Sequence, residues 1–173
     1  MNHDALGKVL EHLHIQAVYP TRIDGTVAAW FDRRQRFDSF TRVGWETSEV
    51  TAAEVTFNNA AGDHVFHLMK FLASTRTRIV RVGEGGIPGD QEELNADDIV
   101  LDLSVDFVVE YAVMGSKPED LDPDGMAEFA THNMPYHLWP YYRQLAQDFA
   151  LRMQVPIPTI PSFRVPKSHQ PKT

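Results

Sequence analysis

The chain has 173 residues, of which 43% are hydrophobic and 23% are charged, and it contains no cysteine. This length and composition predict one ordinary globular domain with a core of its own. The lack of cysteine excludes a disulfide framework, a thiolate zinc site and a cysteine nucleophile. It also suits a reducing compartment. Since the chain shows neither a secretory signal nor a window of about 20 apolar residues, we expect a cytoplasmic protein without membrane insertion.

The net charge of −8 is unevenly distributed along the chain. The segment from Glu84 to Glu128 holds fourteen acidic residues and one basic residue, Lys117. Such a stretch repels phosphate groups, so we expect no nucleic-acid partner. It is either a solvated face that keeps the protein soluble or a surface that attracts a basic partner.

The first third of the chain predicts a short helix and then strands. Asp4 is a candidate cap for a helix whose apolar residues recur at helical spacing, namely Leu6, Val9, Leu10 and Leu13. Alternating apolar residues from Ile15 to Ile23 predict an edge strand, and Asp24-Gly25 predicts a hairpin into a strand at 27–31. The segment 32–49 is interpreted as an irregular crossing or a broken strand.

Three further strands are expected in the middle of the chain, at 52–58, 64–82 and 98–113. The second of them begins with apolar residues on both faces, which predicts core on one side and another subunit or a ligand on the other. The third is the clearest: its odd positions are all apolar, while Asp102, Asp106 and Glu110 stand at even positions. Strict alternation of this kind predicts one buried and one solvated face of an antiparallel sheet.

The C-terminal third predicts a short helical piece at 123–133 and a long helix at 136–153. The apolar stripe of the long helix marks its packing or oligomer interface and comprises Leu138, Trp139, Tyr142, Leu145, Phe149 and Met153. The proline-rich segment 155–163 is too rich in proline for a helix or a central strand. We therefore expect a single domain over residues 1–163 and a disordered basic tail at 164–173.

No pattern of reactive side chains indicates an enzyme. The eight histidines form no convergent set, so no metal site is expected. The glycine-rich run 83–90 lacks the lysine and the helix start of a phosphate loop, so no nucleotide or other cofactor is expected. Asp102 and Asp106 are interpreted as part of a solvated face, although they remain the acids to mutate if an activity is found.

The sequence around the long helix resembles the SecB export chaperones. Trp139-Pro140-Tyr141, Arg143 and Leu145 match the family's aromatic-Pro-Tyr-x-Arg-Glu-Leu helix start, with Gln144 in place of the acid. The segment 155–163 matches the family's proline-rich crossing segment and ends in Ser162-Phe163 where the family has an Asn-Phe-like pair. The match covers about 30 residues. The short N-terminal helix is more similar to the solitary SecB-like chaperones of toxin–antitoxin systems.

The resemblance implies an α+β fold, with a four-stranded antiparallel sheet, the long C-terminal helix packed on it and a short N-terminal helix. It also implies an ATP-independent holdase that works as a homotetramer, a dimer of dimers, and binds unfolded preproteins or an antitoxin in apolar grooves. The residues that we expect to line such a client groove are Trp30, Phe31, Phe57, Phe66, Leu68 and Phe71.

Two alternatives stay open. The chain lacks the second C-terminal helix that contacts the SecA motor in the export chaperone, which puts that partner in doubt, although the acidic strand face is where a basic segment of SecA would bind. The other alternative is a dedicated adaptor that uses the same fold to bind one folded partner protein.

Overall fold

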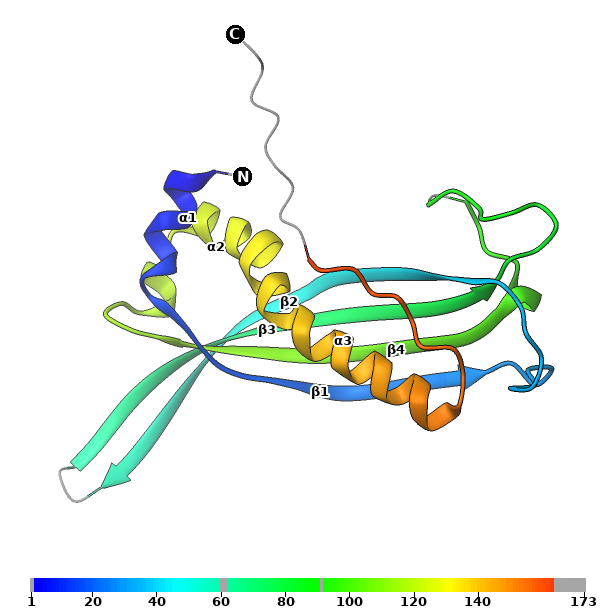
Figure 1. The fold of residues 1–173 in the computed structure, drawn as a ribbon. Helices are drawn as coiled ribbons and strands as arrows, with labels where there is room; N and C mark the ends of the chain where they lie inside the picture. The colour runs from blue at the N-terminus through cyan, green and yellow to red at the C-terminus, as the bar shows by residue number, and fades with distance from the viewer. Residues whose placement is uncertain (1, 60–61, 91, 164–173) are drawn as a thin grey trace, which may run out of the picture.

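The computed structural model describes residues 2–59, 62–90 and 92–163, and its centre is one antiparallel sheet (Figure 1). The strands lie in the order β1-β4-β3-β2. Their bounds are β1 (Leu13–Val27), β2 (Ser39–Asn59), β3 (Gly62–Arg81) and β4 (Ile99–Val113). The helices are α1 (His3–Leu10), α2 (Pro123–Glu128) and α3 (Met134–Met153), and a π-helical turn (Phe129–Asn133) joins the last two. The predicted α+β class is confirmed.

The short N-terminal helix is present, but its cap is not the predicted one. The Asn2 side chain accepts the N-capping hydrogen bond from the backbone N–H of Ala5 at 3.2 Å. Asp4 instead lies in the first turn, where a negative charge is favourable beside the helix N-terminus. Leu6 and Val9 are buried as predicted, whereas Leu13 already belongs to β1.

The predicted hairpin at Asp24-Gly25 is wrong. Both residues lie inside β1, where Gly25 stands opposite Leu103 of β4. A Cβ atom at Gly25 would come within 2.4 Å of the Phe149 ring, so this glycine allows close approach of α3 and does not form a turn. The strand expected at 27–31 is also absent, because β1 ends at Val27 and an irregular connection leads to β2.

The segment expected to be irregular contains the first half of β2. This strand starts at Ser39, pairs with β3 along its whole length and carries a bulge between Thr47 and Glu49. The strands expected at 64–82 and 98–113 are confirmed as β3 and β4. Since β4 pairs with β3 only from His67 onward, the start of β3 and the end of β2 project as a two-stranded hairpin (Figure 1).

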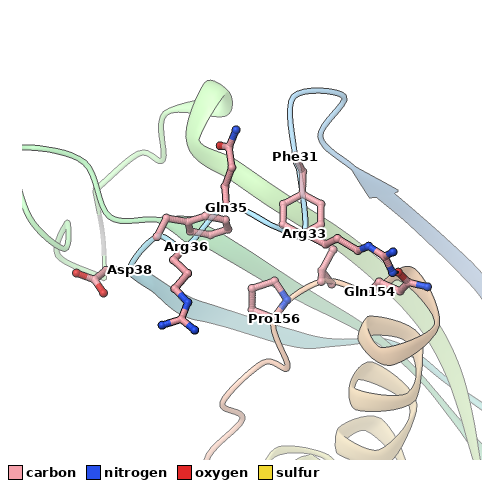
Figure 2. A pocket seen from close by; sticks show the side chains of 9 residues that line it. Phe31, Arg33, Gln35, Arg36, Asp38, Gln154 and Pro156 are labelled. Atoms are coloured by element: carbon pink, nitrogen blue, oxygen red, sulfur yellow. The ribbon is translucent and has the colours of Figure 1, made fainter.

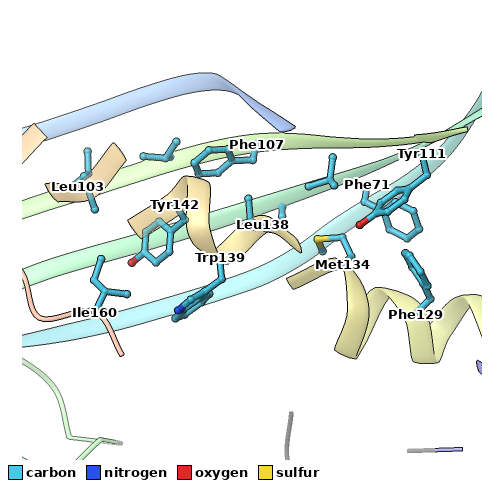
Figure 3. Packing of buried hydrophobic residues seen from close by; sticks show 14 of the residues in the cluster. Phe71, Leu103, Phe107, Tyr111, Phe129, Met134, Leu138, Trp139, Tyr142 and Ile160 are labelled. Atoms are coloured by element: carbon cyan, nitrogen blue, oxygen red, sulfur yellow. The ribbon is translucent and has the colours of Figure 1, made fainter. Parts of the chain in front are cut away.

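Helix α3 packs on one face of the sheet, against the odd positions of β4 (Figure 3). The buried side of α3 is made by Met134, Pro135, Leu138, Trp139, Tyr142, Ala146 and Ala150. The predicted stripe is therefore rotated: Leu145 and Phe149 are half-buried at its flank, and Met153 is 41% exposed, so the helix-packing role predicted for Met153 is wrong. Two alanines in the contact let the helix approach the strands closely.

The proline-rich segment 155–163 runs back across α3 and the sheet without regular structure, as predicted. It buries Val155, Pro158 and Ile160. Its backbone is tied to β2, where the N–H of Thr159 donates to Oγ1 of Thr41 at 3.0 Å. The tail expected to be disordered, at 164–173, lies outside the described residues. Every helix in the described ranges is too short or too polar to cross a bilayer.

Candidate functional site

A hollow of about 440 Å³ lies where the first half of α3, the end of segment 155–163 and the start of β1 meet. We call it the aromatic pocket. It is lined by Ile15, Tyr136, His137, Trp139, Pro140, Tyr141, Arg143, Ser162 and Phe163. None of these nine residues is acidic, and most of the lining is aromatic or aliphatic. The pocket therefore offers an apolar wall with a few polar groups, which is the usual character of a binding site.

Trp139 forms the floor of the aromatic pocket and is held from several sides. Its ring centroid lies 5.2 Å from that of Tyr142 and 5.3 Å from that of Phe163. Its indole N–H donates to the backbone carbonyl of Pro161 at 2.5 Å. The rim is much more open, because Tyr136 is 59% exposed and Tyr141 is 49% exposed. A fixed floor and two open tyrosines leave apolar surface available to a partner.

His137 lies between the aromatic pocket and the core. One of its ring nitrogens, Nδ1, shares a 2.9 Å hydrogen bond with the Tyr111 hydroxyl, and the ring packs beside Phe129. Burial lowers the pKa of His137, since the charged imidazolium loses hydration there. Burial likewise raises the pKa of the Tyr111 phenol well above its usual range. Both side chains are therefore uncharged at neutral pH.

We expect the protein to lose stability as the pH falls from about 7.5 to about 5.5. The unfolded chain takes up a proton on His137 near the usual histidine pKa, whereas the folded chain resists it, so falling pH favours unfolding. The carboxyl groups of Asp98, Asp102 and Glu110 have lowered pKa values. Their contribution to the free energy of unfolding is therefore lost only at more acid pH. Thermal unfolding should show a smaller decrease over this range in His137→Gln. An identical decrease in both proteins would contradict this assignment.

The residues predicted for a client groove do not come together. Trp30 and Phe31 lie in the connection between β1 and β2, whereas Phe57 and Phe66 lie near the projecting β2–β3 turn at the opposite end of the sheet (Figure 1). Trp30 packs under the guanidinium of Arg81, whose Cζ is 4.6 Å from its ring centroid. The sequence therefore marked two separate apolar patches.

The last two of those predicted residues belong to β3. Leu68 is half-buried there, next to the paired part of the sheet. Phe71 is fully buried, with its ring 5.4 Å from Tyr111 and 5.7 Å from Phe129 (Figure 3). The groove role predicted for Phe71 is wrong, because its side chain fills the core.

A second hollow, of about 660 Å³, lies at the other end of segment 155–163 (Figure 2). We call it the arginine pocket. The β1–β2 connection contributes Phe31, Arg33, Gln35, Arg36, Phe37 and Asp38, and the chain after α3 contributes Gln154, Val155 and Pro156. Arg33 hydrogen-bonds the side-chain oxygen of Gln154, which joins the two walls.

The acidic face of β4 is largely paired with cations of β3. Asp102 accepts two hydrogen bonds from Arg76, at 2.8 and 2.5 Å, and Glu110 pairs with Lys70 at 2.9 Å. Burial by itself would raise the pKa of both carboxyl groups, but these cations outweigh it, so both pKa values are lowered. On the strand face predicted to be solvated, two of the three acids are therefore ion-paired, whereas Asp106 accepts a hydrogen bond from Ser74 at 2.8 Å.

Sequence patterns alone missed most of the aromatic pocket. Tyr136 and Ile15 carried no signal of their own, since each looks like an ordinary member of its helix or strand. The available signal was the resemblance itself, because Trp139-Pro140-Tyr141, Arg143 and Ser162-Phe163 all line this pocket. Within the described ranges, no three histidine or carboxylate side chains are placed to hold a metal ion.

Comparison with known proteins gives a fold and no close relative. No family model matches the sequence, and no curated protein matches it. Among solved structures, the chain is similar to the SecB-like chaperone Rv1957 of Mycobacterium tuberculosis, in complex with a ChAD peptide from the Rv1956 HigA1 antitoxin. The TM-score is 0.59 at 13% identity, and the match covers 94% of this chain and 99% of that chain. The architecture that the resemblance implied, from the short N-terminal helix to the crossing segment 155–163, is thereby confirmed: the chain has the fold of a SecB-like chaperone.

Proposed function

We propose that this protein is an ATP-independent holdase chaperone that binds extended apolar segments of unfolded client proteins at the aromatic pocket. The observation that carries the proposal is the pocket's exposed apolar rim, formed by Tyr136 and Tyr141 above a fixed Trp139. The fold supports it, because a chaperone of this fold has been solved with a peptide of an antitoxin. The proposed clients are accordingly an antitoxin or an exported preprotein, and no catalysed reaction is part of the proposal.

The proposal includes a homotetramer, a dimer of dimers, working in the cytoplasm. Support for assembly comes from the edge strand β1, where Tyr19 and Ile23, which lie outside the aromatic pocket, are exposed although they are large and apolar. A second subunit beside this edge would cover them and would pair the free strand. Light scattering should give four times the 19.6 kDa chain mass, and a stable monomer at micromolar concentration would contradict assembly.

SecA is the least supported partner. A basic segment of that motor would need free carboxylates on β4, yet Asp102 and Glu110 already pair with Arg76 and Lys70, and Asp106 alone is left without a cation among the described residues. We therefore propose client holding without a motor.

One observation favours the alternative, a dedicated adaptor for one folded partner. The projecting β2–β3 hairpin carries Phe57, which is 56% exposed and packs on Phe66 with ring centroids 6.3 Å apart. A preformed projection of this kind suits a folded surface better than an unfolded chain. Capture of a single stoichiometric folded protein would favour the adaptor, and capture of many unfolded clients would favour the holdase.

The holdase proposal predicts that the protein slows aggregation of a chemically denatured model client in the absence of ATP. Replacing both Tyr136 and Tyr141 by serine should weaken this effect, because the change removes the exposed apolar rim without touching the core. Light scattering of the diluted client measures the rate. Gln144→Ser, on the exposed side of the same helix, is the matched control and should behave like wild type. A wild-type protein that neither slows aggregation nor binds an extended apolar peptide would contradict the proposal.

A further inference from the structure

We propose that the aromatic pocket selects client segments in which an acidic side chain stands among apolar ones, and that Arg143 is the residue that recognises the acid. This inference rests on the proposed holdase function and adds to it the chemical class of the client segment.

Arg143 has hydrogen-bonding capacity that the described part of the chain leaves unused. Its Nε atom is shielded from solvent and has no hydrogen-bond partner. No described Asp or Glu lies within ion-pair distance of its guanidinium. A guanidinium is always charged and presents its donors in a rigid fork that matches a carboxylate. An unsatisfied donor in a partly buried position costs free energy. A client carboxylate that accepted its hydrogen bond would therefore gain more binding free energy here than on an open surface.

The rest of the pocket wall makes this charge distinctive. None of the other eight lining residues is acidic, and burial lowers the pKa of His137, which keeps it neutral at neutral pH. The Trp139 N–H is already bound to the carbonyl of Pro161. Arg143 is therefore the one charged group among the lining residues, in a wall that is otherwise aromatic and aliphatic. Low polarity around a charge strengthens its attraction for an opposite charge.

The arginine pocket, at the other end of segment 155–163, is also positively charged. Arg33 and Arg36 line it against a single acid, Asp38. An extended segment lying along 155–163 would thus meet cations near both of its ends. Over the whole chain the net charge is −8, so recognition of an acid has to come from such local cations.

The test uses the full-length protein and three short peptides of one apolar, aromatic sequence with Glu, Gln or Lys at a central position. Fluorescence anisotropy at low salt should show wild type binding the Glu peptide about tenfold more tightly than the Gln peptide. Added salt should reduce the difference. In R143Q the preference should disappear, and in R143E it should turn toward the Lys peptide. R152Q, an exposed change at the far end of the same helix, is the matched control and should keep the wild-type preference.

Each outcome decides the proposal. Equal wild-type affinity for the Glu and Gln peptides overturns the selectivity and leaves holding intact, whereas no binding of any peptide overturns the holdase function itself. A preference that persists in folded R143Q assigns recognition to another residue. A changed oligomer mass in R143Q with an unchanged preference shows that Arg143 serves a second copy of the chain instead. If R143Q does not fold, R143K, which keeps the charge but not the fork, should bind the Glu peptide with a reduced preference, and an undiminished one would contradict recognition by the fork.

Discussion

Phe71→Ala is expected to lower the free energy of unfolding by about 3–5 kcal/mol, the cost typical of removing a large aromatic side chain from a core. Phe71 is fully buried and contacts both Tyr111 and Phe129, which link the sheet to the π-helical turn before α3. The residues around it belong to different elements, so they cannot easily collapse into the space that the ring leaves. Urea denaturation followed by tryptophan fluorescence measures the loss.

The matched control is Phe57→Ala, which removes the same side chain from the projecting hairpin. Phe57 is exposed, so the change should cost no more than about 0.5 kcal/mol. Similar losses in the two variants would contradict the core position of Phe71. If the folded Phe71→Ala protein lost client binding with its stability unchanged, Phe71 would belong to the groove after all.

Trp139→Ala is expected to have two effects at once, a loss of about 3–5 kcal/mol in unfolding free energy and a loss of client binding. The indole packs on Tyr142 and Phe163 and ties α3 to segment 155–163 through its hydrogen bond to Pro161. Removing it opens a cavity, leaves that carbonyl unpaired and takes away the floor of the aromatic pocket. Denaturation measures the first effect, and peptide anisotropy below the unfolding transition measures the second.

Tyr141→Ser separates these two effects. Tyr141 lines the same pocket but is half-exposed, so its loss should change the unfolding free energy by less than about 0.5 kcal/mol and still weaken peptide binding. Full peptide affinity in a folded Trp139→Ala protein would contradict the role of this pocket. An unchanged unfolding curve for Trp139→Ala would show that its packing is not maintained in solution.

The elements that could be predicted from the sequence are those with strong internal periodicity. Every odd position of strand β4 from Ile99 to Val113 is apolar, and that side faces the core as expected, although Val100, Val108 and Ala112 at even positions are buried as well. The helical pattern after Pro123 and the proline-rich segment were equally clear. In these segments the local preference and the tertiary environment agree.

The errors occur where tertiary contacts override a local signal. Asp24-Gly25 has the sequence of a hairpin turn, yet pairing with β4 keeps it extended and Phe149 fills the space beside Gly25. On α3, Ala146 and Ala150 are fully buried against the sheet, whereas the larger Leu145 and Phe149 of the predicted stripe are only half-buried.

The candidate site is the hardest feature to predict, because its residues are far apart in the chain. The aromatic pocket joins Ile15 of β1 to residues 136–143 of α3 and to Ser162-Phe163. Periodicity describes one element at a time and cannot show which elements meet. Only the resemblance at the helix start and the crossing segment pointed to part of this site.

Photo-crosslinking with an extended apolar peptide that carries a benzophenone side chain tests the central claim most directly, since it reports where a client segment lies. The holdase account predicts crosslinks to Ile15, to residues 136–143 of α3 and to Phe163, and it predicts that unlabelled denatured client competes for them. Crosslinks confined to the β2–β3 hairpin, or none that the client displaces, would contradict client binding at the aromatic pocket.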